Sequence, residues 1–179
     1  MLLNLVFKNV CLLVLFLSCL SCKNSINKDV VLYKSINEVF NDKIEIEDRV
    51  DNYLTDDKII DQAYVIRQLN TNQRHLVILK GVKDDLFEVL VNSSLSIKNV
   101  NNQNDRFLEL NAKKQELKIV HLGDDNCIIE HEFQYNQNDK GFILSAILKK
   151  CNDEQLNEYF KSEKFGKVNL IDFNIEKQY

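Results

Sequence analysis

The sequence predicts an α+β domain, built as an antiparallel β-meander of six or seven strands with two or three short helices packed at its ends. Three successive runs, residues 117–122, 127–135 and 142–148, carry this prediction. In the second run, apolar residues and His alternate with Glu and Gln, which is typical of a strand with one buried face. The turn-forming residues 136–141 separate the last two runs and favour a hairpin.

The composition is that of one globular domain. The chain has 179 residues, of which 45% are apolar and 28% charged, and its formal net charge is -4. Positive and negative side chains are interspersed, so no basic face is expected and nucleic acid is excluded as a partner.

The N-terminal segment predicts export. Residues 1–20 carry one charge, Lys8, followed by an apolar run over residues 10–17. That run is shorter than the roughly 20 residues that a transmembrane helix needs, but it has the length of a signal-peptide core. The run ends in two Ser-Cys pairs, at Cys19 and Cys22.

A small residue directly before Cys resembles the lipobox of bacterial prolipoproteins. In that family the Cys thiol is acylated and the chain is cleaved just before it. The resemblance implies a signal peptide over residues 1–18, a polar tether over 19–30 and a single domain over 31–179.

Either cysteine can be the acylated one. The residues before Cys19 fit the lipobox better, which favours Cys19. Cleavage before Cys22 would leave only Cys127 and Cys151, an even number that suits an oxidising compartment. An ordinary secretory signal, or an N-terminal anchor helix that is never cut, is the alternative interpretation.

A second resemblance covers residues 62–148. Strand-like runs at 64–66 and 76–79 flank a polar loop, as in the strand–loop–strand of FG-GAP-type calcium repeats that uncharacterised secreted bacterial β-meander proteins carry. Gln68, Asn70 and Asn72 stand at the ligand positions, and Gln73 stands where the repeat has Gly. Calcium sites normally include charged carboxylates. The loop is therefore expected to have lost its metal, and we expect no metal or cofactor.

The remaining elements follow from capping patterns and periodicity. Ser35 and Glu38 form a capping-box pattern. Helices are predicted at residues 35–42, 46–54 and 152–160, further strands at 86–91 and 107–110, and an exposed loop at 92–105. Residues 165–173 are predicted to form a turn and a final strand.

Two groups of side chains could carry chemistry. His121, Asp124, Asp125 and His131 could form a metal site, but no third strong ligand has metal spacing, which favours two strand-face histidines among polar neighbours and an acidic turn. Glu130 and Glu132 could be an acid/base pair, although exposed alternation on a strand explains them equally well. No catalytic motif is recognisable, and we expect no enzymatic activity.

We expect a disulfide between Cys127 and Cys151. Cys127 opens the second run and Cys151 follows the third, so a hairpin places them opposite each other to within one or two positions. The alternative is a pair of free thiols, because a register slip of one residue would put the two side chains on opposite faces.

These observations predict a non-catalytic cell-envelope lipoprotein. A lipid anchor would hold it to the membrane, with the domain facing the periplasm or the exterior and a protein of the envelope as a possible partner. Two alternatives are an immunity-type lipoprotein that neutralises a periplasmic toxin and an envelope hydrolase that uses His121 and His131.

Overall fold

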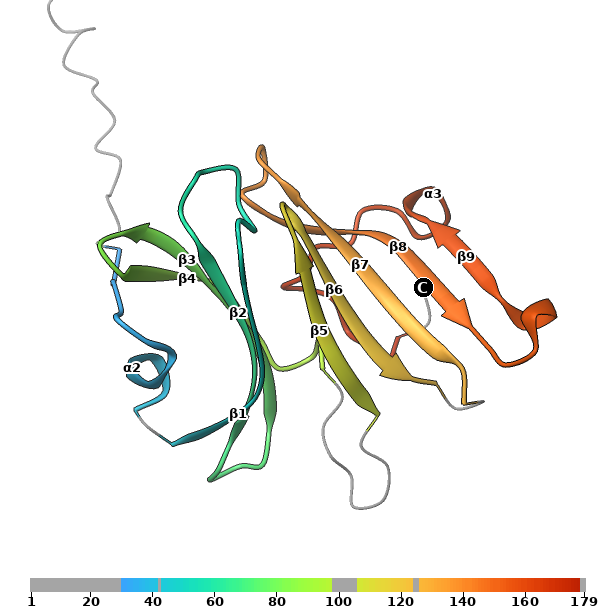
Figure 1. The fold of residues 1–179 in the computed structure, drawn as a ribbon, viewed down its shortest axis with the longest axis horizontal. Coiled ribbons are helices and arrows are strands. Elements are labelled where there is room, and N and C mark those ends of the chain that lie inside the picture. Colours follow the sequence, from blue (N-terminus) through green and yellow to red (C-terminus); the bar gives the residue numbers. More distant parts are fainter. Residues whose placement is uncertain (1–29, 42, 98–105, 124–125, 178–179) are drawn as a thin grey trace, which may run out of the picture. The chain divides into compact units, whose positions relative to one another are not determined.

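The computed structural model describes residues 30–41, 43–97, 106–123 and 126–177. Its strands form two antiparallel sheets, and each sheet is a meander in which chain neighbours pair (Figure 1). The first sheet contains β1 (Ile44–Asn52), β2 (Asp61–Gln68), β3 (Arg74–Lys83) and β4 (Leu86–Ser93). The second contains β5 (Phe107–Lys113), β6 (Glu116–Leu122), β7 (Ile128–Asn136), β8 (Gly141–Lys150) and β9 (Glu158–Lys161).

In the described residues, helical structure is limited to short peripheral turns. The described residues contain α2 (Ile36–Phe40), the 3-10 helix η1 (Glu154–Leu156) and α3 (Ser162–Phe165). A β-rich α+β fold with antiparallel strands is therefore confirmed, but nine strands in two sheets replace the six or seven predicted. No helix in the described part of the chain is long and apolar enough to cross a membrane.

Two of the predicted helices are wrong. Residues 46–54 lie largely in β1, where a bulge at Glu47 shifts the register between Ile46 and Asp48. The extra residue interrupts the period-2 alternation, so the apolar positions on its two sides imitate helical spacing. In the segment 152–160, the Asp153 side chain accepts a hydrogen bond from the backbone of Gln155, but this caps a single 3-10 turn and the chain continues into β9.

The predictions for the two ends of the domain are partly right. A helix forms within residues 35–42, and Glu38 accepts a hydrogen bond from the backbone N–H of Lys34, although Ser35 makes no side-chain cap. The segment 165–173 contains a turn, as expected, but the predicted final strand is wrong, because the segment contributes one isolated bridge, between Asn169 and Ile143 of β8. Of the predicted loop 92–105, residues 98–105 lie outside the described residues.

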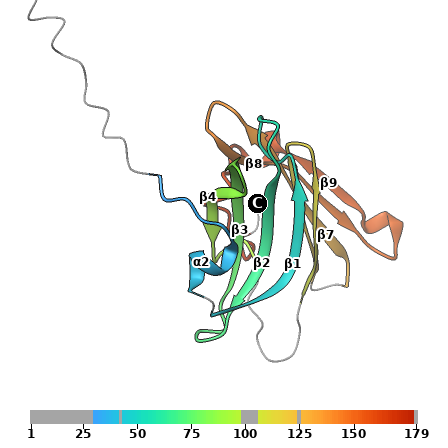
Figure 2. The same cartoon turned by 60° about the vertical axis from the view of Figure 1, so that its left-hand side comes forward.

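The main core lies between the inner faces of the two sheets. It contains buried side chains from both sheets and from the segments that follow β4 and α3. The buried members include Leu54, Val65, Ile78, Ile97, Leu117, Phe133, Leu144 and Phe173. A smaller cluster fills the other face of the first sheet, where α2 packs (Figure 2).

Side chains join the edge strands β1 and β5. The Asp48 carboxylate accepts a hydrogen bond from the backbone N–H of Leu110 at 2.7 Å, and the Asn52 amide donates to the carbonyl oxygen of Ala112 at 3.1 Å. These contacts advance in the same direction along both strands. They satisfy edge groups without a regular ladder between the sheets.

The C-terminal segment 166–175, which we call the strap, closes the opposite side of the core. The backbone N–H of Leu144 bonds to Val168 at 2.9 Å, and that of Ile175 bonds to Leu95, just after β4, at 3.0 Å. Two side chains of the strap, Leu170 and Phe173, are buried in the core. The strap thus connects the second sheet to the end of the first.

Gly81 should tolerate no side chain, because the β1–β2 loop lies directly on it. A Cβ atom there would lie 2.5 Å from the Cγ2 of Ile59 and 2.5 Å from the carbonyl oxygen of Ile60. We expect Gly81→Ala to lower the free energy of unfolding by about 1–3 kcal/mol, as measured by urea denaturation. Gly141→Ala is the control, since the nearest atom to a Cβ at Gly141 is 3.8 Å away. Equal stability of the two variants would contradict this packing.

Candidate functional site

Strand β7 carries the predicted site residues on both faces of the second sheet. His131, Phe133 and Tyr135 point into the core, whereas Glu130 and Glu132 lie on the outer face and contact lysines there. This separates the predicted candidates into two clusters that cannot act as one site.

The inner cluster is a stack of aromatic rings. His121 of β6 and His131 of β7 are diagonal neighbours, and their rings are parallel to within 4° with centroids 5.0 Å apart. Phe173 of the strap packs edge-on against His131, with centroids 4.9 Å apart. Both histidines are buried, so the prediction that they lie among polar neighbours on a strand face is wrong.

Burial decides the protonation state of His131. Burial lowers the pKa of His131, the neighbouring His121 acts in the same direction, and together they bring it to about 3. The Nδ1 atom of His131 is buried without a hydrogen-bond partner. The ring is therefore neutral at neutral pH and packs as a flat apolar group.

The metal site considered in the sequence analysis combined these two histidines with two aspartates. Asp124 and Asp125, the other members of the predicted cluster, lie outside the described residues. Within the described ranges, no group of three or more His, Cys, Asp or Glu side chains is placed to hold a metal ion.

The outer cluster is a charged ladder across three strands. The Lys118 ammonium lies 2.7 Å from Glu130 and 2.9 Å from Glu132, and the Lys150 ammonium lies 2.5 Å from Glu130. Glu130 is buried beneath these two lysines, so it is not the exposed residue that alternation suggested. Val120 and Ala146 on the same face are also covered.

The ladder fixes the charges of its members. Burial by itself would raise the pKa of Glu130, but hydrogen bonds from Lys118 and Lys150 outweigh it and lower the pKa. Burial would likewise lower the pKa of Lys118, yet its bonds to Glu130 and Glu132 raise it. A carboxylate and an ammonium held in their charged forms are poorly suited to exchange protons at neutral pH, which disfavours an acid/base pair at Glu130 and Glu132.

A disulfide joins Cys127 and Cys151 in the structure, with their Cα atoms 4.3 Å apart. In the β7–β8 ladder Ile128 pairs with Lys150, so the two cysteines occupy the next opposed positions. The bond ties the start of β7 to the end of β8. The two cysteines assigned to acylation, Cys19 and Cys22, lie outside the described residues.

The polar groups of the β2–β3 loop form hydrogen bonds with one another and with the ends of the flanking strands. The backbone N–H of Gln68 bonds to the carbonyl oxygen of Gln73 at 2.9 Å, and Thr71 donates its hydroxyl to the Gln68 side chain at 3.1 Å. Asn72 adopts a left-handed conformation with φ 56° and accepts from Arg67. Two of the three amide oxygens at the expected ligand positions, those of Gln68 and Asn72, are thus engaged in local hydrogen bonds.

Two buried charged residues, Asp61 and Arg74, were not identified by the sequence analysis. Asp61 is fully buried and accepts from the backbone N–H groups of Thr55 at 2.7 Å and Gly81 at 2.9 Å. Arg74 is 3% exposed and its guanidinium pairs with Glu47 while lying over the ring of Phe107. In β2, Asp61 lies on the same face of the strand as the buried residues Ala63 and Val65, so the alternation along the sequence could have identified it as buried. The sequence around Arg74 contains no comparable pattern.

Comparison of the chain with protein-family models, with curated proteins and with solved structures gives no match.

The buried His131 should make the fold acid-sensitive. Its pKa is about 3 in the fold and about 6.5 in an unfolded chain. Between these values the unfolded chain binds more protons, so the free energy of unfolding should fall as the pH is lowered through this window. His131→Phe removes the titrating group, and between pH 7 and pH 4 it should lose about 2–3 kcal/mol less stability than the wild type.

Urea denaturation at each pH measures this difference. Phe133→Leu is the control, since it weakens the same core without removing a titrating group, and its stability should depend on pH as the wild type's does. Parallel pH profiles for the wild type and His131→Phe would show that His131 is not the acid-sensitive group.

The disulfide should contribute measurable stability. It closes a loop with a sequence separation of 24 residues, and the chain-entropy estimate for such a loop is about 3–4 kcal/mol. Reduction should lower the urea midpoint accordingly, and a Cys127→Ala, Cys151→Ala variant should be insensitive to reductant. Alkylation of both thiols in the exported protein without prior reduction, detected by mass spectrometry, would show that the bond does not form.

Proposed function

We propose that the protein is a lipid-anchored cell-envelope protein whose domain binds or shields another envelope component and catalyses no reaction. The observation that carries the proposal is the order of features at the N-terminus: Lys8, an apolar run of signal-peptide length, two Ser-Cys pairs and a polar tether. Cys19 or Cys22 would carry the lipid, and the domain would face the periplasm or the exterior.

The disulfide supports this location. Disulfides persist in oxidising compartments and are rare in reducing ones. A bond between two strands of the meander fits a domain that folds after export.

The two clusters of the second sheet support a non-catalytic role. His121 and His131 stack within the core beneath Phe173, so this region presents no reacting group to a substrate. Glu130 is held as a carboxylate between two ammonium groups on the outer face. The envelope hydrolase, which relied on the histidines, is disfavoured by their burial.

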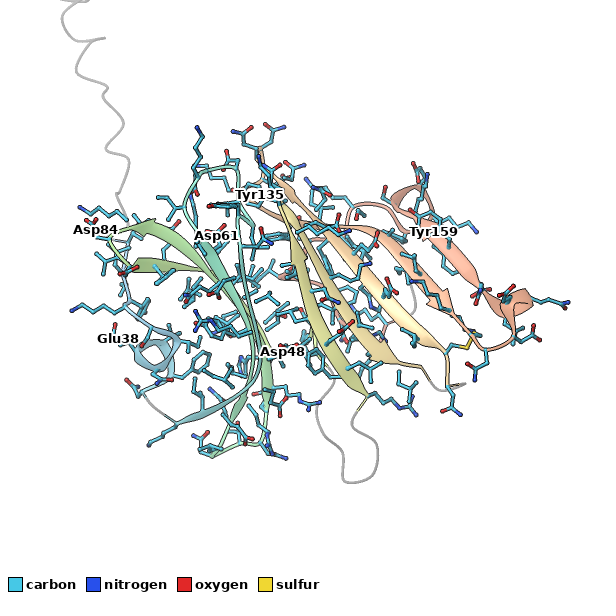
Figure 3. All side chains as sticks on the ribbon, in the orientation of Figure 1. Glu38, Asp48, Asp61, Asp84, Tyr135 and Tyr159 are labelled. Carbon is cyan, nitrogen blue, oxygen red and sulfur yellow. A yellow bond between two sulfur atoms is a disulfide. The ribbon has the colours of Figure 1, made fainter. Side chains whose placement is uncertain are left out.

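One observation favours the toxin-neutralising alternative. The outer face of the second sheet is a broad surface, and its central charges are fixed by the Lys118–Glu130–Lys150 ladder. Tyr159 of β9 is exposed beside it (Figure 3). Preorganised charges and an exposed tyrosine are features of specific protein interfaces. A toxin gene beside the gene for this protein would favour this role.

Acylation is the direct test of the proposal. Cells grown with a fatty-acid analogue should label the protein, and a Cys19→Ala, Cys22→Ala double variant should lose the label. Each single variant identifies the acylated cysteine. Stable anchoring takes more than one acyl chain, and the double variant would carry none. If its signal peptide is still cleaved, the double variant should therefore be found in the soluble fraction. A double variant that keeps the label would refute the lipid anchor.

A further inference from the structure

Four apolar side chains stay exposed at one end of the first sheet. Val31 is 62% exposed, Leu32 38%, Ile59 38% and Ile60 50%. We call these four residues the N-terminal patch. Val31 and Leu32 lie in the segment where the described chain begins, and Ile59 and Ile60 end the β1–β2 loop.

The hydrogen-bonding pattern brings the two parts of the patch to the same place. Ile59 and Ile60 lie on Gly81 of β3, and Gly81 pairs with Phe87 of β4. Phe87 in turn exchanges two backbone hydrogen bonds of 2.8 Å with Tyr33. Neighbouring strands are about 4.8 Å apart, so Gly81 and Tyr33 are separated by about 10 Å. Figure 1 shows the segment that starts the described chain beside the β3–β4 turn.

The fold itself gives these side chains no cover. Phe87 and Tyr64 belong to the cluster on the α2 side of the first sheet and are buried. None of the four patch residues belongs to that cluster. Single exposed apolar residues are common on protein surfaces, but a group gathered at one site marks a contact with another apolar surface.

The charges around the patch nearly balance. Lys34, Lys58 and Lys83 are exposed, and Asp84 and Asp85 occupy the β3–β4 turn beside them. In Figure 3 the side chain of Asp84 lies at the outer end of this hairpin. Attraction to an anionic surface is therefore weak, and burial of apolar side chains must supply most of a contact here.

The length of the chain before the patch identifies the partner. If Cys19 carries the lipid, residues 19–29 connect it to the described chain. A chain of that length spans about 40 Å at most. The patch follows the tether directly, so it is the part of the domain held nearest to the membrane.

We propose that the N-terminal patch rests on the phospholipid surface and inserts its apolar side chains among the headgroups. This inference rests on the proposed lipid anchor and extends it, because it assigns the domain one preferred face. The tether keeps the local lipid concentration high, so a weak contact is sufficient. The outer face of the second sheet would then remain available to other partners.

The chain contains no tryptophan, so one introduced residue can report on its own environment. Mature acylated Ile60→Trp protein, with its signal peptide removed, is reconstituted into vesicles of phosphatidylethanolamine and phosphatidylglycerol. Its fluorescence should shift to shorter wavelength, and lipids that carry a nitroxide near the headgroup should quench it. Tyr159→Trp is the matched control, since Tyr159 is 55% exposed on β9 of the other sheet, and it should remain unquenched.

A second substitution tests the patch as a unit. Adding Val31→Asp to the Ile60→Trp protein should reduce quenching severalfold without changing the melting temperature, because Val31 is exposed. Quenching should also persist at high salt, where attraction between exposed charges is screened.

The outcomes separate this inference from the anchor on which it rests. Acylated Ile60→Trp protein that is not quenched, or Tyr159→Trp protein that is quenched equally, would overturn the membrane-facing patch and leave the anchor intact. Mass spectrometry of the same sample shows whether the chain carries lipid, and a chain without lipid would overturn the anchor itself.

Discussion

The burial of one apolar core between two sheets is the constraint on which the rest of this structure depends. Two twisted sheets that share a core leave two open sides through which water could reach it. At one side, Asp48 and Asn52 connect β1 to the backbone of β5. At the other, the strap inserts Leu170 and Phe173 and bonds to Leu95. A few side chains from irregular segments therefore complete a core that regular strands begin.

The same constraint explains why one strand holds polar residues in opposite states. Inward-facing His131 is buried against the rings of His121 and Phe173, so its charged form is penalised and it stays neutral. Glu130, its neighbour in sequence, points outward and meets two ammonium groups, so its charged form is favoured. Alternation along a strand thus places titratable side chains in different dielectric surroundings. Neither arrangement needs a catalytic role to account for it.

The parts of the two sheets that do not face the core are the surfaces to which the proposed roles are assigned. The second sheet covers the core with its inner face and presents its charged ladder outward. The first sheet packs against the core on one face and against α2 on the other, and it leaves apolar side chains exposed at the end where the chain enters. A lipid-anchored domain would use these regions differently, one toward the membrane and the other toward a partner. The disulfide holds the open end of the β7–β8 hairpin together.

The sequence by itself determined the strands with clear alternation or a continuous apolar run, since period-2 burial is a local signal; β7 and β8 were found this way. It also placed Cys127 opposite Cys151 to within one or two positions, because the hairpin turn limits the register, and the structure fixed the exact pairing. Only the tertiary structure decided that residues 46–54 are a strand, because the bulge at Glu47 hides the alternation. It also decided that His121 and His131 are buried, because Phe173, some 40 residues further along, packs against His131 and no local pattern records such a distant contact.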